Sequence, residues 1–354
     1  MEQIVLIGGY GEHGRNCFLV PYRQGHCYML DCGIMDQETV TGPEISDSQL
    51  DETDYIFITH CHKDHAGAFD SLVARGFTGL LITTRMTYTL LKMNYENVLF
   101  LDMTKDHLEL GELRIDYGRT GHCAGSVWLS LADGQKTVFY SGDYQEDTLA
   151  YRCDAVSGRE ADIALVDMAH DSCDQGGEEL RKELIRRIRL SNEAGKQAIL
   201  PIQKYGRGIE IIALLQQEGI SFAIDSTVKN CCGDMLAEDT WYKKDISLQD
   251  IPCMNADDPR CADYSVYLVG DTHLAKAENR RYVEEMLHSG RCSVIITGRI
   301  KRGSFNEKLL STGEASAIPY PHHQSRKDFE VMTARNHFKV ILPFHNNKKE
   351  IYFG

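Results

Sequence analysis

The six residues His60–His65, with the sequence HCHKDH, place three imidazoles and a carboxylate in one short segment. They follow the apolar run Tyr55–Ile58, which predicts a buried strand, so the segment should form a tight loop at a strand end. Neutral imidazole and carboxylate oxygen are the ligands that zinc, iron and manganese accept in proteins. The sequence therefore predicts a metal site at the end of this strand.

The spacing within the segment favours two ions rather than one. His60 and His62 alternate along the loop and are expected to bind one ion. Asp64 and His65 lie further around the turn and are expected to face a second ion, at the roughly 3.5–4 Å spacing of two-metal hydrolytic centres. Solvated loop histidines are the alternative interpretation, which a cluster of four such side chains disfavours.

Two later segments are expected to supply further ligands. His122 lies between two strand-like stretches, residues 113–117 and 127–131, so it can join the first ion from a separate loop. The apolar run Val138–Tyr140 leads through a Ser-Gly pair into Asp143, which places a carboxylate at the mouth of a buried strand. We expect Asp143 to bridge both ions.

Asp31 ends another strand-like run, Tyr28–Leu30. A carboxylate in this place fits a hydrogen-bond partner that fixes the ring orientation of a liganding histidine. A solvated turn acid is the alternative for Asp31 taken alone.

In order and in spacing, these residues resemble the successive motifs of the metallo-β-lactamase superfamily. The resemblance implies an α/β fold, the four-layer αβ/βα sandwich, with two mixed sheets back to back and helices outside. It also implies a dinuclear metal centre at the edge of the sheets. The chemistry class is then hydrolysis, while the substrate stays open.

The second half of the chain is similar to the β-CASP nucleases of that superfamily. Residues 201–210 resemble the stretch in which a strand runs into a Gly-Arg turn and a helix. Asp225, within residues 221–226, matches the first motif of the family's inserted domain, and residues 294–298 resemble a later strand with its glycine turn. The opening, residues 11–17, is similar to the entry segment of these nucleases.

The last histidines complete the resemblance. His323 falls where the family places a histidine after a small residue, although the adjacent His322 makes the two hard to separate. His345 falls where a final strand, residues 339–345, delivers the last histidine to the metal site. The resemblance links a histidine at this place with RNA-processing members of the family, which favours RNA over DNA.

The resemblance predicts a compact member with three segments. Residues 1–196 are expected to form the first part of the metallo-β-lactamase domain, residues 197–318 a small α/β β-CASP-like cap domain, and residues 319–354 the return segment of the first domain. A helix over residues 178–190, with Leu180, Leu184 and Ile188 on one face, is expected to close the first part.

Composition adds limits of its own. The formal net charge of −14 is unusual for a protein that binds a polyanion. Basic residues do occur in the proposed cap motifs, so a basic cleft on an acidic body is one interpretation and ordinary solvated charge the other. These residues are Lys204, Arg207, Arg299, Lys301 and Arg302.

Neither a targeting segment nor a membrane span is evident from the sequence. No run reaches the roughly 18 apolar residues of a membrane helix, and no basic start leads into an apolar stretch, so a cytoplasmic protein without a membrane is expected. The 12 cysteines show no C-x-x-C pair, which predicts reduced thiols.

The resulting hypothesis is a metal-dependent phosphodiester hydrolase of the β-CASP ribonuclease type. Two divalent ions, zinc first with manganese or iron as alternatives, would supply hydroxide. The expected ligands are His60, His62, Asp64, His65, His122, Asp143 and His345, with Asp64 also counted as catalytic. His323 would donate a proton to the leaving oxygen, and Asp225 would hold its ring.

Two other functions stay open at this point. One is a small-molecule ester or phosphodiester hydrolase, which the acidic surface favours. The other is a catalytically silent scaffold subunit of an RNA-processing or defence complex, which the intact ligand set disfavours. A homodimer or a partner subunit is open in each case.

Overall fold

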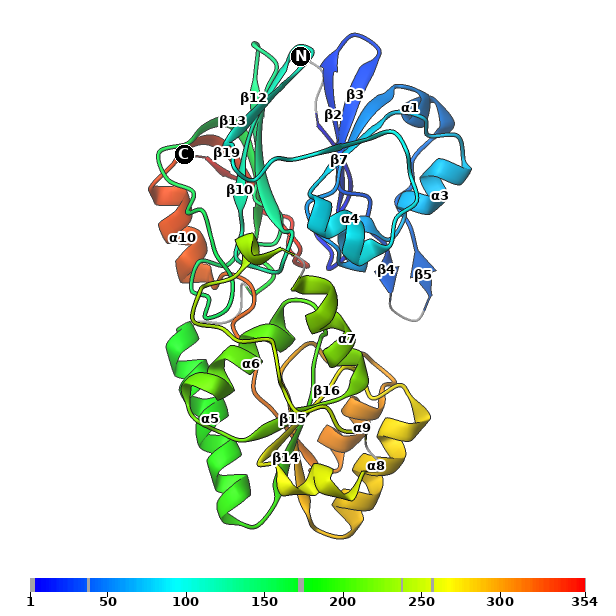
Figure 1. Ribbon diagram of the computed structural model, residues 1–354. Coiled ribbons are helices and arrows are strands. Elements are labelled where there is room, and N and C mark those ends of the chain that lie inside the picture. The colour runs from blue at the N-terminus through cyan, green and yellow to red at the C-terminus, as the bar shows by residue number, and fades with distance from the viewer. Residues whose placement is uncertain (1–3, 37–38, 171–174, 237, 256–257, 354) are drawn as a thin grey trace. The chain divides into compact units, whose positions relative to one another are not determined.

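The computed structural model describes residues 4–36, 39–170, 175–236, 238–255 and 258–353. The chain divides into two compact units (Figure 1). The first unit combines Met1–Glu146, Arg152–Asp174 and His323–Gly354, and the second combines Asp147–Tyr151 and Gln175–His322. Each unit is described by itself.

The first unit is built on two sheets. One has six strands in the order β1-β2-β3-β6-β7-β8, and the other has seven in the order β20-β19-β13-β12-β11-β10-β9. The first sheet contains β1 (Val5–Gly8), β2 (Cys17–Arg23), β3 (His26–Leu30), β6 (Thr53–Phe57), β7 (Leu80–Thr83) and β8 (Val98–Phe100). The second contains β9 (His107–Leu110), β10 (Leu113–Arg119), β11 (Val127–Ala132), β12 (Thr137–Tyr140), β13 (Glu160–Asp167), β19 (His337–Phe344) and β20 (Tyr352–Phe353).

The two sheets pack face to face through aromatic side chains. The ring of Phe18 in β2 lies 5.5 Å from that of Tyr140 in β12 and 5.6 Å from that of Phe344 in β19. All three residues are fully buried. Successive residues of a strand point to opposite faces of its sheet. The residues next to these three therefore point to the outer faces, which helices cover.

Helices cover the outer face of each sheet. Phe69 and Leu72 of α3 pack with the outer side chains of the first sheet, and Phe329 and Met332 of α10 pack with those of the second. The helices of this unit are α1 (Asp47–Asp51), α2 (Lys63–Ala66), α3 (Phe69–Ala74), α4 (Arg85–Leu91) and α10 (Arg326–Ala334), and two short strands, β4 (Met35–Asp36) and β5 (Val40–Thr41), pair beside them. This helix–sheet–sheet–helix order confirms the predicted four-layer α/β fold class.

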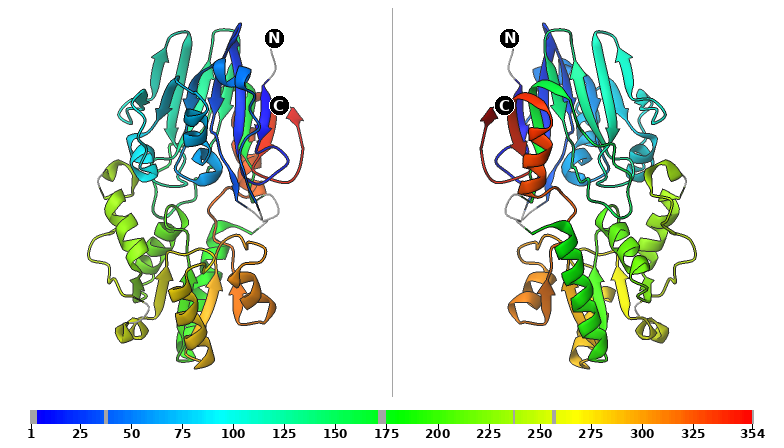
Figure 2. Two further views of the ribbon diagram at one scale, coloured as in Figure 1. Left: turned by 90° about the vertical axis from the view of Figure 1, so that its right-hand side faces the viewer. Right: turned by 90° about the vertical axis from the view of Figure 1, so that its left-hand side faces the viewer.

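The second unit is a parallel sheet with helices on both faces (Figures 1 and 2). Its five strands have the order β15-β16-β14-β17-β18. They are β14 (Gln197–Pro201), β15 (Phe222–Ile224), β16 (Val266–Val269), β17 (Cys292–Ile296) and β18 (Ala315–Ala317). The helices are α5 (Gly177–Glu193), α6 (Arg207–Gln217), α7 (Ser226–Met235), α8 (Ala277–His288) and α9 (Phe305–Ser311), with short 3₁₀ turns η1 (Asp239–Trp241) and η2 (Pro259–Asp263).

The division of the chain differs from the predicted one. The boundaries fall after Asp174 and His322 rather than after residues 196 and 318, and residues 147–151 also join the second unit. Helix α5 lies beside β14 and therefore belongs to the second unit instead of closing the first. Its apolar face, with Leu184 and Ile188 buried, has the predicted pattern, but that pattern does not say which sheet the helix covers.

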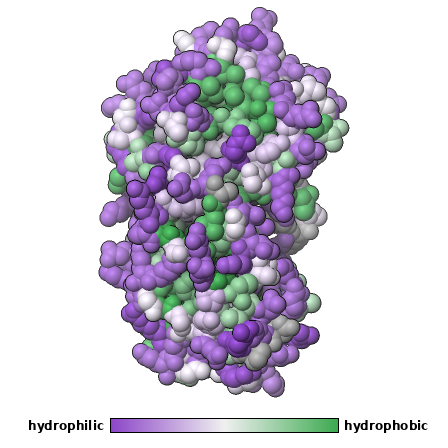
Figure 3. All heavy atoms as spheres, viewed as in Figure 1, coloured by the Kyte–Doolittle hydropathy of each residue, from purple (hydrophilic) through white to green (hydrophobic). Residues whose placement is uncertain are grey.

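Polar side chains dominate the face of the molecule seen in Figure 3. This agrees with the low mean hydropathy of −0.34 and the charged fraction of 25%. Among the described residues, none of the helices is both long enough and apolar enough to cross a membrane.

Candidate metal centre

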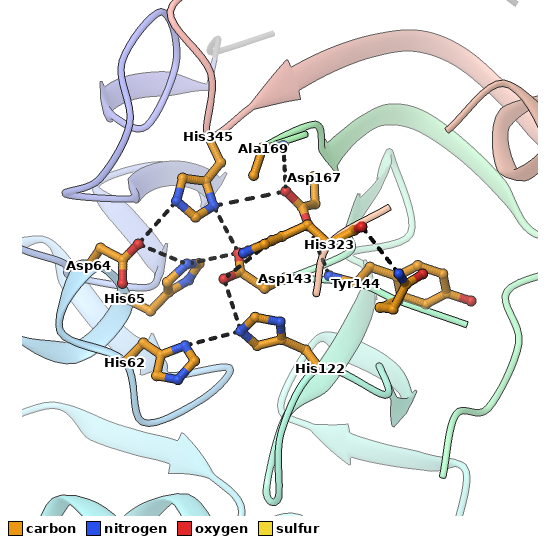
Figure 4. Close-up of polar contacts among 12 residues, drawn as sticks. His62, Asp64, His65, His122, Asp143, Tyr144, Asp167, Ala169, His323 and His345 are labelled. Atoms are coloured by element: carbon orange, nitrogen blue, oxygen red, sulfur yellow. Dashed lines mark hydrogen bonds and ion pairs between the residues drawn. The ribbon is translucent and has the colours of Figure 1, made fainter. Parts of the chain in front are cut away.

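The predicted ligands of the first unit converge because they follow strands that run in the same direction. Strand β3 is parallel to β6, and β12 is parallel to both β13 and β19, so the carboxyl ends of these strands meet at one edge of each sheet. Strand β10 runs in the same direction as β12, since β11 pairs antiparallel with both. Figure 4 shows the resulting cluster around Asp143.

Four donor atoms form the first half of the centre. The Nδ1 of His62 lies 3.0 Å from the Nε2 of His60 and 3.0 Å from the Nε2 of His122. The Oδ2 of Asp143 lies 3.4 Å from the Nε2 of His60 and 3.3 Å from the Nε2 of His122. A tetrahedral ion with bonds of about 2.0–2.1 Å needs donors about 3.3–3.4 Å apart. These four atoms therefore have the spacing of a tetrahedral ligand set.

The other oxygen of Asp143 faces a second group of donors. Its Oδ1 lies 3.0 Å from the Nε2 of His65 and 3.1 Å from the Nδ1 of His345. The Nε2 of His345 lies 3.1 Å from the Oδ2 of Asp64, and the amide nitrogen of Asn16 lies 2.8 Å from the Nε2 of His65. Asp143 thus has one oxygen in each group, as a bridging carboxylate does.

Asp31 orients histidines of both groups. Its Oδ2 lies 2.7 Å from the Nδ1 of His65 and accepts a hydrogen bond of 2.8 Å from the hydroxyl of Thr59. The Thr59 oxygen lies 3.1 Å from the Nδ1 of His60, so this network turns the Nε2 of both rings toward Asp143. Tyr140 donates a further hydrogen bond of 2.6 Å to Asp31. A carboxylate behind a liganding histidine fixes the tautomer and the ring orientation in this way.

The buried carboxylates of the cluster favour positive charge on the groups beside them. Burial alone would lower the pKa of His65, but the carboxylates of Asp143 and Asp31 outweigh it and hold that pKa well above its usual value. Burial likewise opposes the charge on His345, whose pKa Asp143 and Asp64 nevertheless raise to about 10. Protons on these two rings therefore balance the carboxylates, a role that divalent cations fill with neutral imidazoles.

The remaining imidazoles already favour the neutral form. Burial lowers the pKa of His60, and it lowers that of His122 well below the usual value. Neutral imidazole is the form that binds a metal ion. The donor types, the spacing of the first group and these charges together fit divalent metal ions.

The backbone is strained at two of these residues. Asp31 has φ 57° and His345 has φ 65°, which non-glycine residues adopt rarely and mainly at functional sites. The loop after β3 also needs Gly33, because an added Cβ would overlap the carbonyl of Asp64 and lie 2.8 Å from the backbone nitrogen of His65. This close approach holds the loop that carries Asp31 against helix α2, which carries Asp64 and His65.

Asp167 is a member of the centre that the sequence reasoning missed. It is fully buried at the end of β13, and its Oδ2 lies 2.9 Å from the Nδ1 of His323. Its Oδ1 lies 3.9 Å from the Nδ1 of His345. An acid directly after the strand-like run Ile163–Val166 was the available signal, the same that identified Asp31 and Asp143.

The ring of His323 lies in the cluster (Figure 4). Its ring centroid is 4.7 Å from that of His122 and 5.2 Å from that of His345. His322 is buried and belongs to the second unit. The two adjacent histidines are thus separated by the boundary between the units.

Asp225, the predicted partner of the His323 ring, lies in the second unit. The carboxylate beside His323 is that of Asp167, whereas Asp225 lies in the second unit as the N-cap of α7. There it accepts hydrogen bonds of 2.8 Å from the nitrogen of Val228 and 3.0 Å from that of Gly270. A cap of this kind satisfies backbone donors at the start of a helix, so Asp225 has a structural role of its own.

Comparison with known proteins agrees with this geometry. Residues 10–172 match the family described as the metallo-beta-lactamase superfamily. The chain is 25% identical over 252 residues to the transcription termination factor FttA of Methanothermobacter thermautotrophicus, covering 61% of this chain and 39% of the relative. It is 26% identical over 227 residues to an RNase J-like protein of Methanocaldococcus jannaschii, covering 59% and 53%. The chain thus spans about half or less of the length of these relatives.

The fold has a counterpart over nearly its whole length. A crystal structure of a protein of unknown function from Enterococcus faecalis V583 superposes with a TM-score of 0.63 at 12% identity, covering 98% of this chain and 94% of that one. At this identity the likeness concerns the fold alone. The sequence matches, which include the metallo-β-lactamase superfamily over residues 10–172, support the predicted resemblance to the β-CASP nucleases of that superfamily.

Proposed function

We propose that this chain is a metal-dependent phosphodiester hydrolase that cleaves RNA. The observation that carries the proposal is the arrangement around Asp143, whose two oxygens face two separate groups of donors. Histidines and carboxylates in such paired groups suit two divalent ions, and zinc best matches the four-donor group. The names of the relatives, which include an RNase J-like protein, favour RNA as the substrate.

The roles of the side chains follow from their partners. His60, His62 and His122 with Asp143 would hold one ion, and Asp64, His65 and His345 with Asp143 the other. Bound there, the ions would make hydroxide available near neutral pH and offset charge on a phosphoryl group.

His323 is the proposed proton donor to the leaving oxygen. Its side chain is partly exposed, 13%, whereas the ligand His65 is fully enclosed, so His323 can meet a substrate. Asp167 orients its ring through Nδ1, as carboxylates do for histidines that transfer protons. In this role Asp167 replaces the Asp225 of the sequence prediction.

The test is cleavage of an internally labelled RNA panel, with DNA and a chromogenic phosphodiester as controls, before and after chelation. We expect RNA cleavage that chelator abolishes and that zinc or manganese restores. His60→Gln should remove the activity, while His337→Gln, an exposed histidine on β19, should retain it. Activity on the chromogenic phosphodiester alone would support a small-molecule hydrolase instead. If His60→Gln leaves the metal content unchanged and the unmutated protein cleaves no substrate, the scaffold subunit is favoured.

A further inference from the structure

The parallel sheet of the second unit has a topological switch point between β14 and β17. These strands are neighbours, but β14 continues through α6 to β15 at one edge of the sheet, and β17 continues through α9 to β18 at the other. In open α/β sheets, ligands bind outside the carboxyl ends of the strands at such a point, because the two connections diverge there. Arg207 follows the end of β14, and Thr297 and Gly298 follow the end of β17.

Arg207 is a buried cation that has no counter-charge in the described part of the chain. It is the first residue of α6 and is only 8% exposed. Among the residues that the structure describes, no acceptor is paired with its guanidinium, and its Nε is fully buried without a partner. Burial is the only cause that lowers its pKa, to about 10, so the group stays charged at neutral pH while no neighbouring acid compensates it.

The nearest acid along the helix is already engaged. The carboxylate of Glu210 accepts hydrogen bonds from the backbone nitrogens of Leu149, Ala150 and Tyr151, at 2.9, 2.7 and 3.3 Å. All of these residues belong to the second unit. Taking a charge out of water without a partner is costly, so a buried arginine in this position calls for an anion from outside the chain.

The residues around the guanidinium leave its nitrogen atoms available to an anion. A Cβ added to Gly298 would lie 2.6 Å from its Nη1 and closer still to its Nη2, so the group lies directly against the glycine backbone. The adjacent Thr297 is 1% exposed, and its hydroxyl has no hydrogen-bond partner among the described residues.

Two donors without a partner among the described residues therefore lie at this edge: the Arg207 guanidinium and the buried Thr297 hydroxyl. Arginine binds phosphate oxygens through two parallel hydrogen bonds, and a hydroxyl can donate a further one. We propose that the switch point of the second unit binds a phosphate group, with Arg207 as its main partner and Thr297 as a second donor. The site needs no metal ion and does not rest on the proposed hydrolysis.

The test is calorimetric titration of the full chain with chelator present and chloride matching the ionic strength. Three probes separate the sources of the phosphate: inorganic phosphate, a nucleoside 5′-monophosphate and a short RNA without a terminal phosphate. We expect at least one of them to bind, and Arg207→Met to weaken that binding about 10–100-fold. Binding of the RNA alone would assign the site to the nucleic acid backbone, and binding of the small probes to a free phosphorylated ligand.

Two further variants make the result specific. Gly298→Ala keeps the charge but displaces the guanidinium, so it should weaken binding as Arg207→Met does. Arg299→Met removes an exposed charge from the same loop and should leave binding within about twofold. Methionine in place of a lone buried charge should not lower the melting temperature in phosphate-free buffer.

The proposal is overturned if none of the three probes binds, or if Arg207→Met and Gly298→Ala bind them as the unmutated protein does. An arginine with a purely structural role would change the melting temperature equally with and without phosphate. If the unmutated protein binds phosphate but does not cleave RNA, the proposed function is contradicted and the phosphate site is still supported.

Discussion

In each unit, charged side chains lie at the sheet edge where parallel strands end. The two units differ in whether these charges have partners of opposite charge. In the first unit, both oxygens of Asp143 contact imidazoles, one in α2 and three that follow β6, β10 and β19, and His323 contacts Asp167. In the second, Arg207 has no counter-charge among the described residues. The first edge is organised for cations and the second for an anion, which shows that one kind of sheet edge can serve either charge.

Replacing Asp143, the carboxylate that both donor groups share, should have the largest effect on the first unit. Asp143→Asn removes the charge that faces both donor groups, so we expect loss of both ions and a fall in RNA cleavage greater than the roughly 10²–10⁴-fold effect of losing a proton donor. Metal analysis and single-turnover cleavage measure this. Asp106→Asn, at an exposed acid of the same unit, is the control, and full metal content in Asp143→Asn would refute the bridging role.

Removing His323 separates proton transfer from metal binding. His323→Gln should lower kcat about 10²–10⁴-fold while the ions stay bound, because the ring is held by Asp167 and not by the four-donor group. The measurement is kcat together with metal content. If His323→Gln loses an ion as well, the residue is a ligand rather than a proton donor.

The stability of the chelated protein should depend on pH in a defined sense. The folded-state pKa of His345 is raised to about 10, so its stabilising contribution is complete below about pH 6.5 and is lost as the pH rises toward 10. We expect a loss on the order of 5 kcal/mol over that range by denaturant unfolding. With metal bound the loss should be absent, and His345→Gln should reduce it in the chelated protein. An identical decline with and without metal would contradict the charge balance.

A smaller effect is expected behind the ligands. Asp31→Asn leaves the metal donors in place but weakens the hold on the rings of His65 and, through Thr59, His60. Metal affinity should fall about 10–100-fold, measured by competition with a chromogenic chelator. Unchanged affinity would show that the strained loop alone positions these rings.

Local signals made the first unit the more predictable part. The residues His60–His65 lie close in sequence and follow one strand, so their spacing alone predicted a metal site. Asp143 was predicted because it follows an apolar strand, and His345 was predicted from the resemblance to the last motif of the family. Asp167 has the same local signal, but its role depends on β13 pairing with both β12 and β19, and no short segment contains that information.

The second unit shows where such reasoning ends. The apolar face of α5 predicted a helix correctly, yet the same face could cover either sheet, and only the long-range contact with β14 decides. Asp225 was given a catalytic role by resemblance, whereas its side chain caps α7. Burial of Arg207 was equally hidden, because in the sequence it looks like any basic residue near a turn.

The most direct test of the account is a crystal of the protein grown with zinc, with anomalous scattering recorded at the zinc edge. We predict two peaks, one bonded at about 2.0–2.1 Å to the Nε2 of His60 and the Oδ2 of Asp143 and the other beside the Oδ1 of Asp143. An anomalous map with neither peak at Asp143 would contradict the central claim.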